Sequence, residues 1–233
     1  MNGKPRILVK GAGVAGLTAA VTLAERGGVV TLYDCAERVG AGASWMAGGM
    51  LAPWCEAESA PAEVTAQSVD SVDWWAAHVP GVVREGSLVL APARDVGELA
   101  RFGRRTSHFQ TVGEADIARL EPDLAGRFQK GLFFADEGHV DPRKALPALA
   151  QSLLQMGGQV VLATGQTLDE SGFDWVVDCT GLHVRDQLDH LRGVRGEMLL
   201  LRCPDVILHR PVRMLHPRIP VYIVPRDNHV FMV

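Results

Sequence analysis

The sequence predicts an α/β fold with two domains, one built on a parallel sheet and the other on an antiparallel sheet. Three patterns support this prediction: a strand–helix–strand unit near the start, a helix followed by two strands after residue 141, and short strands over residues 197–233. Strands joined through a helix pair in parallel, whereas closely spaced short strands separated by turn residues pair antiparallel. Because the patterns alternate along the chain, we expect the two domains to interleave.

The first strand–helix–strand unit is the clearest element. Residues 6–10 form a short apolar strand, and an Ala/Leu-rich helix over residues 17–26 stops at the glycine pair 27–28. Glycine commonly ends a helix because it tolerates the left-handed conformation. Residues 29–33 form the second strand, with Asp34 at its end. This length of about 30 residues is typical of a βαβ unit with a parallel sheet.

The remaining elements follow from periodicity and from proline and glycine positions. Helices are predicted over residues 66–78, 95–105, 115–120 and 142–156. Strands are predicted over residues 87–90, 131–134, 159–162, 175–178, 197–202, 207–215, 221–224 and 229–233. The resulting domains comprise residues 1–80 and 136–193, the part with the parallel strands, and residues 81–135 and 194–233, the antiparallel part.

Composition excludes several classes of protein. The chain has 233 residues, a formal net charge of −4 and a hydrophobic fraction of 47%. Proteins that bind nucleic acids or membrane surfaces normally carry a basic excess, so neither partner is expected. The four cysteines are scattered without a CxxC pair, the histidines lack metal-ligand spacing, and no secretory signal is recognisable. We therefore predict a cytoplasmic protein with reduced thiols and no metal.

A dinucleotide-binding motif follows the first strand. Gly11, Gly13 and Gly16 form a GxGxxG pattern between a strand and a helix, and Asp34 ends the next strand. The glycines permit a tight turn, close approach of a pyrophosphate and close helix–strand packing, and the helix N-terminus favours the phosphate charge. Asp34 can accept hydrogen bonds from ribose hydroxyls and would repel the 2′-phosphate of NADP. The alternative is a glycine-rich turn that binds nothing.

A second cluster of small residues distinguishes FAD from NAD. It contains Gly42, Ala43 and Ser44, followed by Ala47 and then Gly48 and Gly49. Small side chains over a further stretch allow the backbone to pack along an extended cofactor, and FAD is therefore the preferred ligand. On composition alone, a flexible loop remains the alternative.

The chain resembles the FAD-binding part of the D-amino-acid oxidase superfamily, and more closely the glycine oxidases of thiamin biosynthesis (ThiO type). The segments that carry the resemblance occur in family order: residues 11–16, 34, 42–45, 47–53, 139–143, 176–181, 195–199 and 221–226. The resemblance implies an FAD-binding Rossmann-type domain with an interleaved antiparallel-sheet substrate domain. Its implied cofactor contacts are Gly11, Gly13, Val14, Ala15, Gly16, Asp34, Cys35, Gly42, Ala43, Ser44, Ala47, Gly48, Gly49, Thr180 and Gly181.

The resemblance also has two departures. The family usually places Glu at the position of Asp34, and it continues well past residue 233 with an Arg that clamps the substrate carboxylate. The chain thus resembles the first two-thirds of the enzyme, and we expect a substrate domain that is truncated at the C-terminus. For the 233 residues alone we expect little glycine-dependent peroxide release and an exposed sheet edge at residues 229–233.

The implied reaction is oxidation of glycine or a small D-amino acid to its imine, with O₂ reduced to H₂O₂, feeding thiazole formation. The flavin performs the chemistry, so no side chain is expected to act as acid, base or nucleophile. Met50, Tyr222 and Arg226 match substrate-side positions. Each has a structural alternative: a core methionine, a strand tyrosine, and an arginine paired with acids at the domain junction.

Two other functions remain open from the sequence. One is an FAD oxidoreductase for another amine or amino acid, such as a sarcosine-type enzyme. The other is an inactive flavin-binding fragment or a subunit completed by a second chain. A small amino acid and O₂ are the expected partners, and the protein is expected to form a homo-oligomer.

Overall fold

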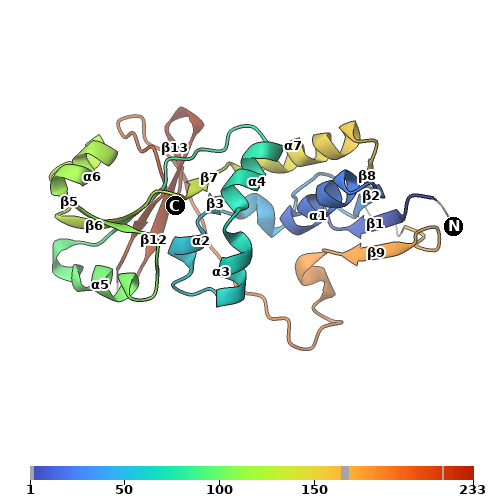
Figure 1. Cartoon of the computed structure of the whole chain (residues 1–233), viewed down its shortest axis with the longest axis horizontal. Helices are drawn as coiled ribbons and strands as arrows, with labels where there is room; N and C mark the ends of the chain where they lie inside the picture. The colour runs from blue at the N-terminus through green and yellow to red at the C-terminus, as the bar shows by residue number, and fades with distance from the viewer. Residues whose placement is uncertain (1–2, 164–167, 217) are drawn as a thin grey trace. The chain divides into compact units, whose positions relative to one another are not determined.

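The computed structural model describes residues 3–163, 168–216 and 218–233. It has a mixed α/β architecture with parallel and antiparallel sheets, as predicted (Figure 1). The chain divides into two compact units. Unit 1 comprises Met1–Ala47, His78–Pro80 and Pro142–Gly196, and unit 2 comprises Gly48–Ala77, Gly81–Asp141 and Glu197–Val233. The chain therefore passes between the two units several times.

Unit 1 is built on a four-stranded parallel sheet in the order β8-β2-β1-β9. Its strands are β1 (Arg6–Lys10), β2 (Val29–Asp34), β8 (Gln159–Leu162) and β9 (Trp175–Asp178). Its helices are α1 (Val14–Glu25) and α7 (Pro142–Gln155), with the short 3₁₀ turns η1 (Ala43–Met46) and η4 (Gly181–Val184). The strands β8 and β9 have the bounds that the sequence predicted.

The helices α1 and α7 pack against each other beside this sheet (Figure 1). Leu146, Leu149 and Leu153 of α7 are each at most 1% exposed and lie three or four positions apart, so they form one buried face. Pro142 begins α7, where the missing N–H of proline has no helical partner to lose. Fully buried Leu8 and Val9 of β1 complete the core of this unit.

Unit 2 is built on a seven-stranded mixed sheet in the order β10-β13-β12-β11-β4-β6-β5. These strands are β4 (Ser87–Leu90), β5 (Gln110–Gly113), β6 (Lys130–Phe134), β10 (Leu200–Arg202), β11 (Val212–Met214), β12 (Val221–Arg226) and β13 (Val230–Met232). A separate antiparallel pair joins β3 (Met50–Leu51) to β7 (Gly138–His139). Only the contact between β4 and β11 is parallel among the pairings described in the large sheet.

Unit 2 also contains short helices. They are α2 (Pro53–Glu56), α3 (Ala62–Ser68), α4 (Ser71–His78, whose last residue belongs to unit 1), α5 (Gly97–Gly103) and α6 (Glu114–Leu120). The 3₁₀ turns are η2 (Ala93–Asp95), η3 (Pro122–Leu124) and η5 (Asp227–His229). Phe102 of α5 and Phe134 of β6 meet edge to face in one core cluster, with ring centroids 6.3 Å apart. Leu88, Leu90 and Ile117 form a second cluster.

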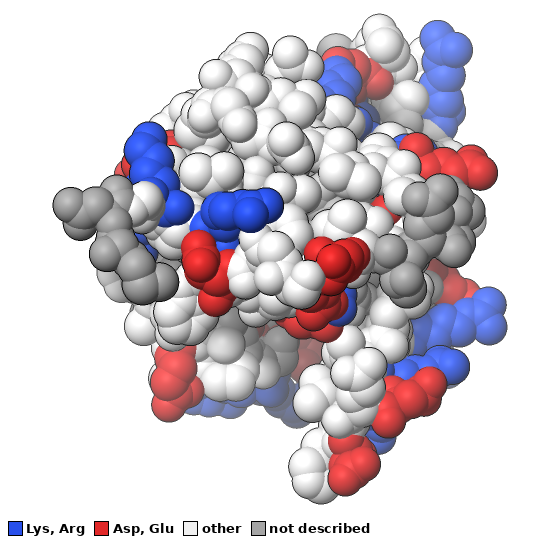
Figure 2. Space-filling model, turned by 90° about the vertical axis from the view of Figure 1, so that its right-hand side faces the viewer, with Lys and Arg blue, Asp and Glu red and all other residues white. Residues whose placement is uncertain are grey.

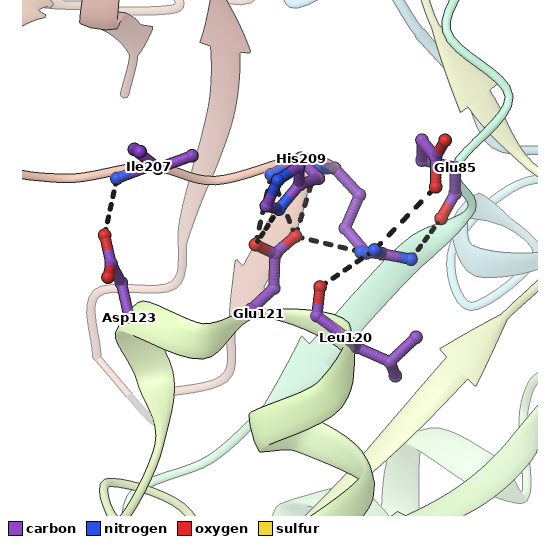
Figure 3. Close-up of polar contacts among 7 residues, drawn as sticks. Glu85, Leu120, Glu121, Asp123, Ile207 and His209 are labelled. Atoms are coloured by element: carbon purple, nitrogen blue, oxygen red, sulfur yellow. Dashed lines mark hydrogen bonds and ion pairs between the residues drawn. The ribbon is translucent and has the colours of Figure 1, made fainter.

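A buried carboxylate anchors the segment that leads into β11 (Figure 3). Glu121 is fully buried, and it accepts hydrogen bonds from the backbone N–H groups of His209 and Arg210 at 3.0 and 3.1 Å. Arg210 Nε donates to the same carboxylate at 2.9 Å. Close by, the backbone N–H of Ile207 donates to Asp123 at 2.6 Å. The acids at the end of α6 and in η3 thus fix this segment against the rest of unit 2.

The guanidinium of Arg210 has further partners. It donates to the carbonyl oxygens of Glu85 and Leu120 at 2.5 and 2.9 Å. Arg210 is only 6% exposed, so its charge depends on these contacts and on Glu121. Arg210 and Glu121 thus form a buried ion pair whose guanidinium also donates to two backbone carbonyl groups. Such a pair holds the two segments together.

The structure corrects several sequence-based expectations. The helix predicted over residues 66–78 is two helices, α3 and α4, and that over 95–105 is shortened to α5 after η2. The exposed edge expected at residues 229–233 is wrong, because β13 lies between β10 and β12. As expected from their common domain, the late strands share one sheet with β4, β5 and β6, since β11 pairs with β4.

The compact units also differ from the domain boundaries expected from the sequence. Residues 48–77 and 136–141 belong to unit 2 and not to unit 1, and residues 194–196 belong to unit 1. The pairing of β3 with β7 explains the first difference, because it keeps residues 50–51 beside residues 138–139. Residues 1–2, 164–167 and 217 of the expected domains lie outside the described residues.

The charged side chains on the surface agree with the small net charge of the chain. Figure 2 shows acidic and basic side chains interspersed among other residues on the face that it draws. Within the described residues, no helix is long and apolar enough to cross a bilayer. Cys35, Cys55, Cys179 and Cys203 are all free thiols.

Candidate functional site

The glycine motif forms a tight turn between β1 and α1. Gly11 has φ +100°, and a Cβ there would lie 2.4 Å from the carbonyl oxygen of Cys179. A Cβ on Gly16 would lie 1.7 Å from the carbonyl oxygen of Gly11. Both positions therefore exclude any side chain, and the first turn of α1 can approach β1 and the segment after β9.

The N-terminus of α1 is open to a ligand. Gly13 is the N-cap residue and provides no side-chain cap, while Val14 and Ala15 are exposed. Ser44 Oγ accepts a hydrogen bond from the Val14 N–H at 2.9 Å and would lie 3.1 Å from a Cβ on Gly13. The positive end of the helix dipole and the N–H groups of this turn suit an anion such as a pyrophosphate.

The turn lies at the carboxyl edge of the parallel sheet. β1 has β2 on one side and β9 on the other, so the chain order reverses between β1 and β9. In open parallel sheets, nucleotides bind outside the carboxyl ends of the strands at such a switch point. Gly11, Asp34 and Thr180 follow or end these three strands. The topology of unit 1 therefore brings Gly11, Asp34 and Thr180, which are predicted cofactor contacts, to the carboxyl edge of the parallel sheet.

Asp34 has a structural role that the sequence did not reveal. Its carboxylate accepts hydrogen bonds from the backbone N–H groups of Ala12 at 2.6 Å and Ala36 at 2.9 Å. The side chain therefore holds the glycine turn as well as the segment after β2. Each carboxylate oxygen retains a further lone pair for a ribose hydroxyl. The turn, the N–H groups at the start of α1 and Asp34 together fit the adenosine diphosphate part of FAD.

The expected effect of Asp34→Asn is a loss of about 1–3 kcal/mol in FAD affinity, because a charged hydrogen-bond acceptor is removed. Affinity is measured by titrating FAD into apoprotein and following flavin fluorescence. Thermal unfolding of the apoprotein separates this loss from damage to the turn through Ala12. An unchanged FAD affinity would show that Asp34 serves the turn alone.

The second cluster continues along unit 1. Gly42 is the N-cap of η1, and Ser44 of η1 contacts α1 as described above. Trp45 lies beneath the guanidinium groups of Arg38 and Arg143, at 4.0 and 5.4 Å from the ring centroid. The cluster is thus an ordered turn in the structure and not an unstructured loop. Ala43 also lies in η1, Ala47 is its C-cap, and Cys35 is exposed directly after β2.

Gly48 and Gly49 belong to unit 2, where they make packing contacts and hydrogen bonds within the fold. A Cβ on Gly48 would lie 2.6 Å from Met232, and the Gly48 carbonyl accepts a hydrogen bond from Arg226. The Gly49 carbonyl accepts a hydrogen bond from the Val140 N–H at 2.9 Å. Contact of these two glycines with the cofactor stays a prediction.

Thr180 and Gly181 follow β9 at the carboxyl edge of the unit 1 sheet. Asp178 accepts hydrogen bonds from the Thr180 N–H and hydroxyl at 3.0 and 2.6 Å. These bonds lower the pKa of Asp178, with the Thr180 hydroxyl contributing most. Gly181 begins η4. A contact of this turn with FAD stays a prediction.

The predicted substrate-side residues Met50, Tyr222 and Arg226 all lie in unit 2. Met50 is half-buried in β3 and packs against the Phe102–Phe134 cluster. Arg226 Nε lies 3.8 Å from Asp141, which supports the alternative role of Arg226 as an arginine that pairs with acids. These contacts give Met50 and Arg226 structural roles, and their substrate roles stay predictions.

Tyr222 lies within a cluster of charges that sequence reasoning missed. Its hydroxyl donates to Glu56 at 3.0 Å, and the Arg213 guanidinium lies 4.8 Å from the ring centroid. Arg213 donates to Glu58 at 2.9 Å. In the structure Arg213 of β11 pairs directly with Tyr222 of β12, a register that the sequence alone does not indicate. Burial, followed by the charge of Glu56, raises the pKa of Tyr222, so the phenol stays protonated.

Glu137 supports the helix that carries Glu56. One of its oxygens accepts hydrogen bonds from the N–H groups of Trp54 and Cys55, at 3.0 and 2.6 Å, in the first turn of α2. Its other oxygen has no hydrogen-bond partner among the described residues. Glu137 is 1% exposed, and burial raises its pKa to about 7 against the opposing hydrogen bond from Cys55.

We expect Glu137 to make stability fall as pH rises. Because its pKa is raised from 4.5 to about 7 in the folded state, the folded protein binds the proton more tightly than the unfolded chain. Its contribution of about 3 kcal/mol is complete below pH 4.5 and is lost as pH rises through 7.

The measurement is the free energy of unfolding of wild type and Glu137→Gln between pH 4.5 and 8. The difference between the two proteins isolates Glu137 from other titrating groups. His139 has the opposite effect, because burial lowers its pKa to about 4. A pH-independent difference between wild type and variant would contradict the assignment.

Comparison with known proteins identifies the family. Residues 6–233 match the model of the FAD dependent oxidoreductase family. The chain is 56% identical over 229 residues to a Rhizobium etli protein whose provisional name is thiamine biosynthesis oxidoreductase ThiO. This alignment covers 98% of the chain and 70% of the relative. A D-amino-acid oxidase of Streptomyces coelicolor is 32% identical over 205 residues, 86% of this chain and 60% of that protein.

Solved structures show the same fold. The glycine oxidase of Geobacillus kaustophilus matches with a TM-score of 0.75 at 22% identity, covering 98% of this chain and 70% of that one. The parallel sheet, the glycine turn and Asp34 are together typical of a dinucleotide-binding domain. The chain belongs to the FAD dependent oxidoreductase family, and FAD is its cofactor.

Proposed function

We propose that the protein oxidises glycine, or a small D-amino acid, to the corresponding imine and passes the electrons to O₂, which yields H₂O₂. The imine would feed thiazole formation in thiamine biosynthesis. The observation that carries this proposal is the 56% identity over almost the whole chain to the Rhizobium etli relative. The D-amino-acid oxidase relative and the glycine oxidase fold support the same class of substrate.

Bound FAD supplies a two-electron acceptor for a hydride from the substrate α-carbon. The chain's own residues would bind FAD and orient it. Gly13 leaves room for the pyrophosphate, and the N-terminus of α1 meets its charge. Asp34 holds the ribose and, through Ala12, the shape of the turn.

On the substrate side, Tyr222 offers a hydroxyl and Met50 an apolar surface. Hydride transfer needs a correctly oriented Cα–H bond and a neutral amine, and it needs no protein nucleophile. The role of unit 2 in this account is therefore to position the amino acid.

We also propose that the protein is cytoplasmic, because its four free thiols fit a reducing compartment. A homo-oligomer stays a prediction that size-exclusion chromatography with light scattering can test.

The test is peroxide release with glycine, D-alanine and sarcosine, each at equal concentration, by FAD-loaded protein extended to the length of the Rhizobium etli relative, of which the present 233 residues cover 70%. We expect glycine or D-alanine to give the highest rate, with one H₂O₂ formed for each imine hydrolysed. A clear preference for sarcosine would favour the secondary-amine alternative. Absence of peroxide with all three, from protein that retains FAD, would contradict an amino-acid oxidase.

A further inference from the structure

We propose that Arg226 is a positioning residue for the cofactor. Its guanidinium holds the backbone at Gly48, where the second cluster of small residues enters unit 2. The inference rests on the predicted contact of Gly48 and Gly49 with FAD, and it does not depend on which amino acid the enzyme oxidises.

The chain enters and leaves unit 2 through two segments that lie side by side. Unit 2 begins at Gly48, and its second stretch ends at Asp141. Just inside these ends, β3 pairs antiparallel with β7, and the Gly49 carbonyl accepts a hydrogen bond from the Val140 N–H at 2.9 Å. Continuing this register by one residue makes Gly48 and Asp141 neighbours at the open end of the pair.

The side chain of Arg226 reaches both segments at once. Arg226 ends β12, and its side chain is only 9% exposed. Its Nη2 donates to the Gly48 carbonyl, and its Nε lies 3.8 Å from a carboxylate oxygen of Asp141. The donors of a guanidinium are fixed in a planar fork, so one arginine can hold a carbonyl and a carboxylate in two directions.

The Gly48–Gly49 backbone requires such a restraint. A Cβ on Gly48 would lie 2.6 Å from Met232, and Gly49 has φ +69°. Because neither residue has a side chain that could anchor it, hydrogen bonds to the main chain restrain the pair. Arg226 restrains the Gly48 carbonyl, and Val140 restrains the Gly49 carbonyl. Loss of the bond from Arg226 would free one end of the segment that is predicted to contact FAD.

A pocket beside Arg226 makes this role directly testable. The pocket has a volume of about 180 Å³, and its lining includes Arg226, Asp141 and His139. Gly81 and Asp227, which are exposed, also line it, so the pocket opens to solvent. Truncating Arg226 to alanine would join the space of the lost side chain to this pocket. A small guanidinium ion from solution would then have access to the position of the lost group.

The test compares FAD binding by wild type and Arg226→Ala in protein extended to the length of the Rhizobium etli relative. FAD is titrated into apoprotein to obtain the dissociation constant, and the visible absorbance spectrum of the bound flavin is recorded. Both measurements are repeated with methylguanidinium and with methylammonium, at concentrations too low to denature the protein.

We expect Arg226→Ala to weaken FAD binding about tenfold, the scale of one lost charged hydrogen bond, and to change the flavin spectrum. Methylguanidinium should restore most of the affinity and the wild-type spectrum, because it carries the same planar fork of donors. Methylammonium has the same charge without the fork and should restore neither.

Two further variants are controls. Arg226→Lys keeps the positive charge beside Asp141 but lacks the fork, so it should bind FAD more weakly than wild type. Arg202→Ala removes an exposed arginine from β10 and should bind FAD as wild type does, with or without methylguanidinium. Thermal unfolding of each apoprotein shows whether the variant folds.

Wild-type FAD affinity and a wild-type flavin spectrum in Arg226→Ala would overturn the inference. So would a loss that methylguanidinium leaves unchanged, or one that methylammonium reverses equally well, because charge alone would then be the cause. If Arg226→Ala does not fold, Arg226→Lys decides: weaker FAD binding supports the inference, and wild-type affinity overturns it. Peroxide release by wild type tests the proposed function separately, since none of these outcomes depends on amino-acid oxidation.

Discussion

Replacing Gly13 with valine is expected to abolish FAD binding. A Cβ at this position already lies 3.1 Å from Ser44 Oγ, and the branched methyl groups would extend beyond it at the N-terminus of α1. A pyrophosphate needs this space to reach the N–H groups of the turn. The expected loss is at least a hundredfold in affinity, measured by FAD titration of the apoprotein.

The control for Gly13→Val is Gly97→Val. Gly97 begins α5 in unit 2, and nothing lies within 4 Å of a Cβ built there. Its valine variant should bind FAD as wild type does. If Gly13→Val retains normal FAD affinity and a normal unfolding curve, the glycine turn is not the pyrophosphate site.

Removing the carboxylate of Glu121 is expected to cause the largest loss of stability. Glu121→Ala leaves Arg210, which is 6% exposed, without its buried partner, and it frees the N–H groups of His209 and Arg210. Breaking a buried pair on one side typically costs about 3–5 kcal/mol. Denaturant unfolding followed by circular dichroism gives the change in the free energy of unfolding.

Two further variants make this prediction specific. The double variant Glu121→Leu with Arg210→Met removes both charges and should lose less stability than Glu121→Ala. Glu98→Ala breaks the exposed pair with Arg101 on α5 and should cost at most about 1 kcal/mol. Equal losses in Glu98→Ala and Glu121→Ala would contradict the buried-anchor account.

The parallel half of the fold could be predicted because its signals are local. The glycine turn, the strands of unit 1 and the helix that begins at Pro142 each follow from neighbouring residues in the sequence. The large sheet of unit 2 could not be predicted, because β11 pairs with β4 across more than one hundred residues. No local pattern specifies such a partner.

In the candidate site, too, local sequence signals could be read, whereas contacts between distant residues could not. Asp34 was predicted from its register with the glycines, but its hydrogen bond to Ala12 depends on the three-dimensional turn. Glu56 and Arg213 were missed because they meet Tyr222 only after β11, β12 and α2 assemble. Isolated charged residues in a sequence carry no signal for such a meeting.

The most direct test of the central claim is anaerobic reduction of the bound flavin. FAD-loaded protein, extended to the length of the Rhizobium etli relative, is mixed with glycine without O₂, and the visible flavin absorbance is followed before and after O₂ is admitted. An FAD-dependent amino-acid oxidase predicts bleaching by glycine or D-alanine, then return of the colour with release of H₂O₂. Flavin that stays oxidised with every amino acid tried would contradict the account.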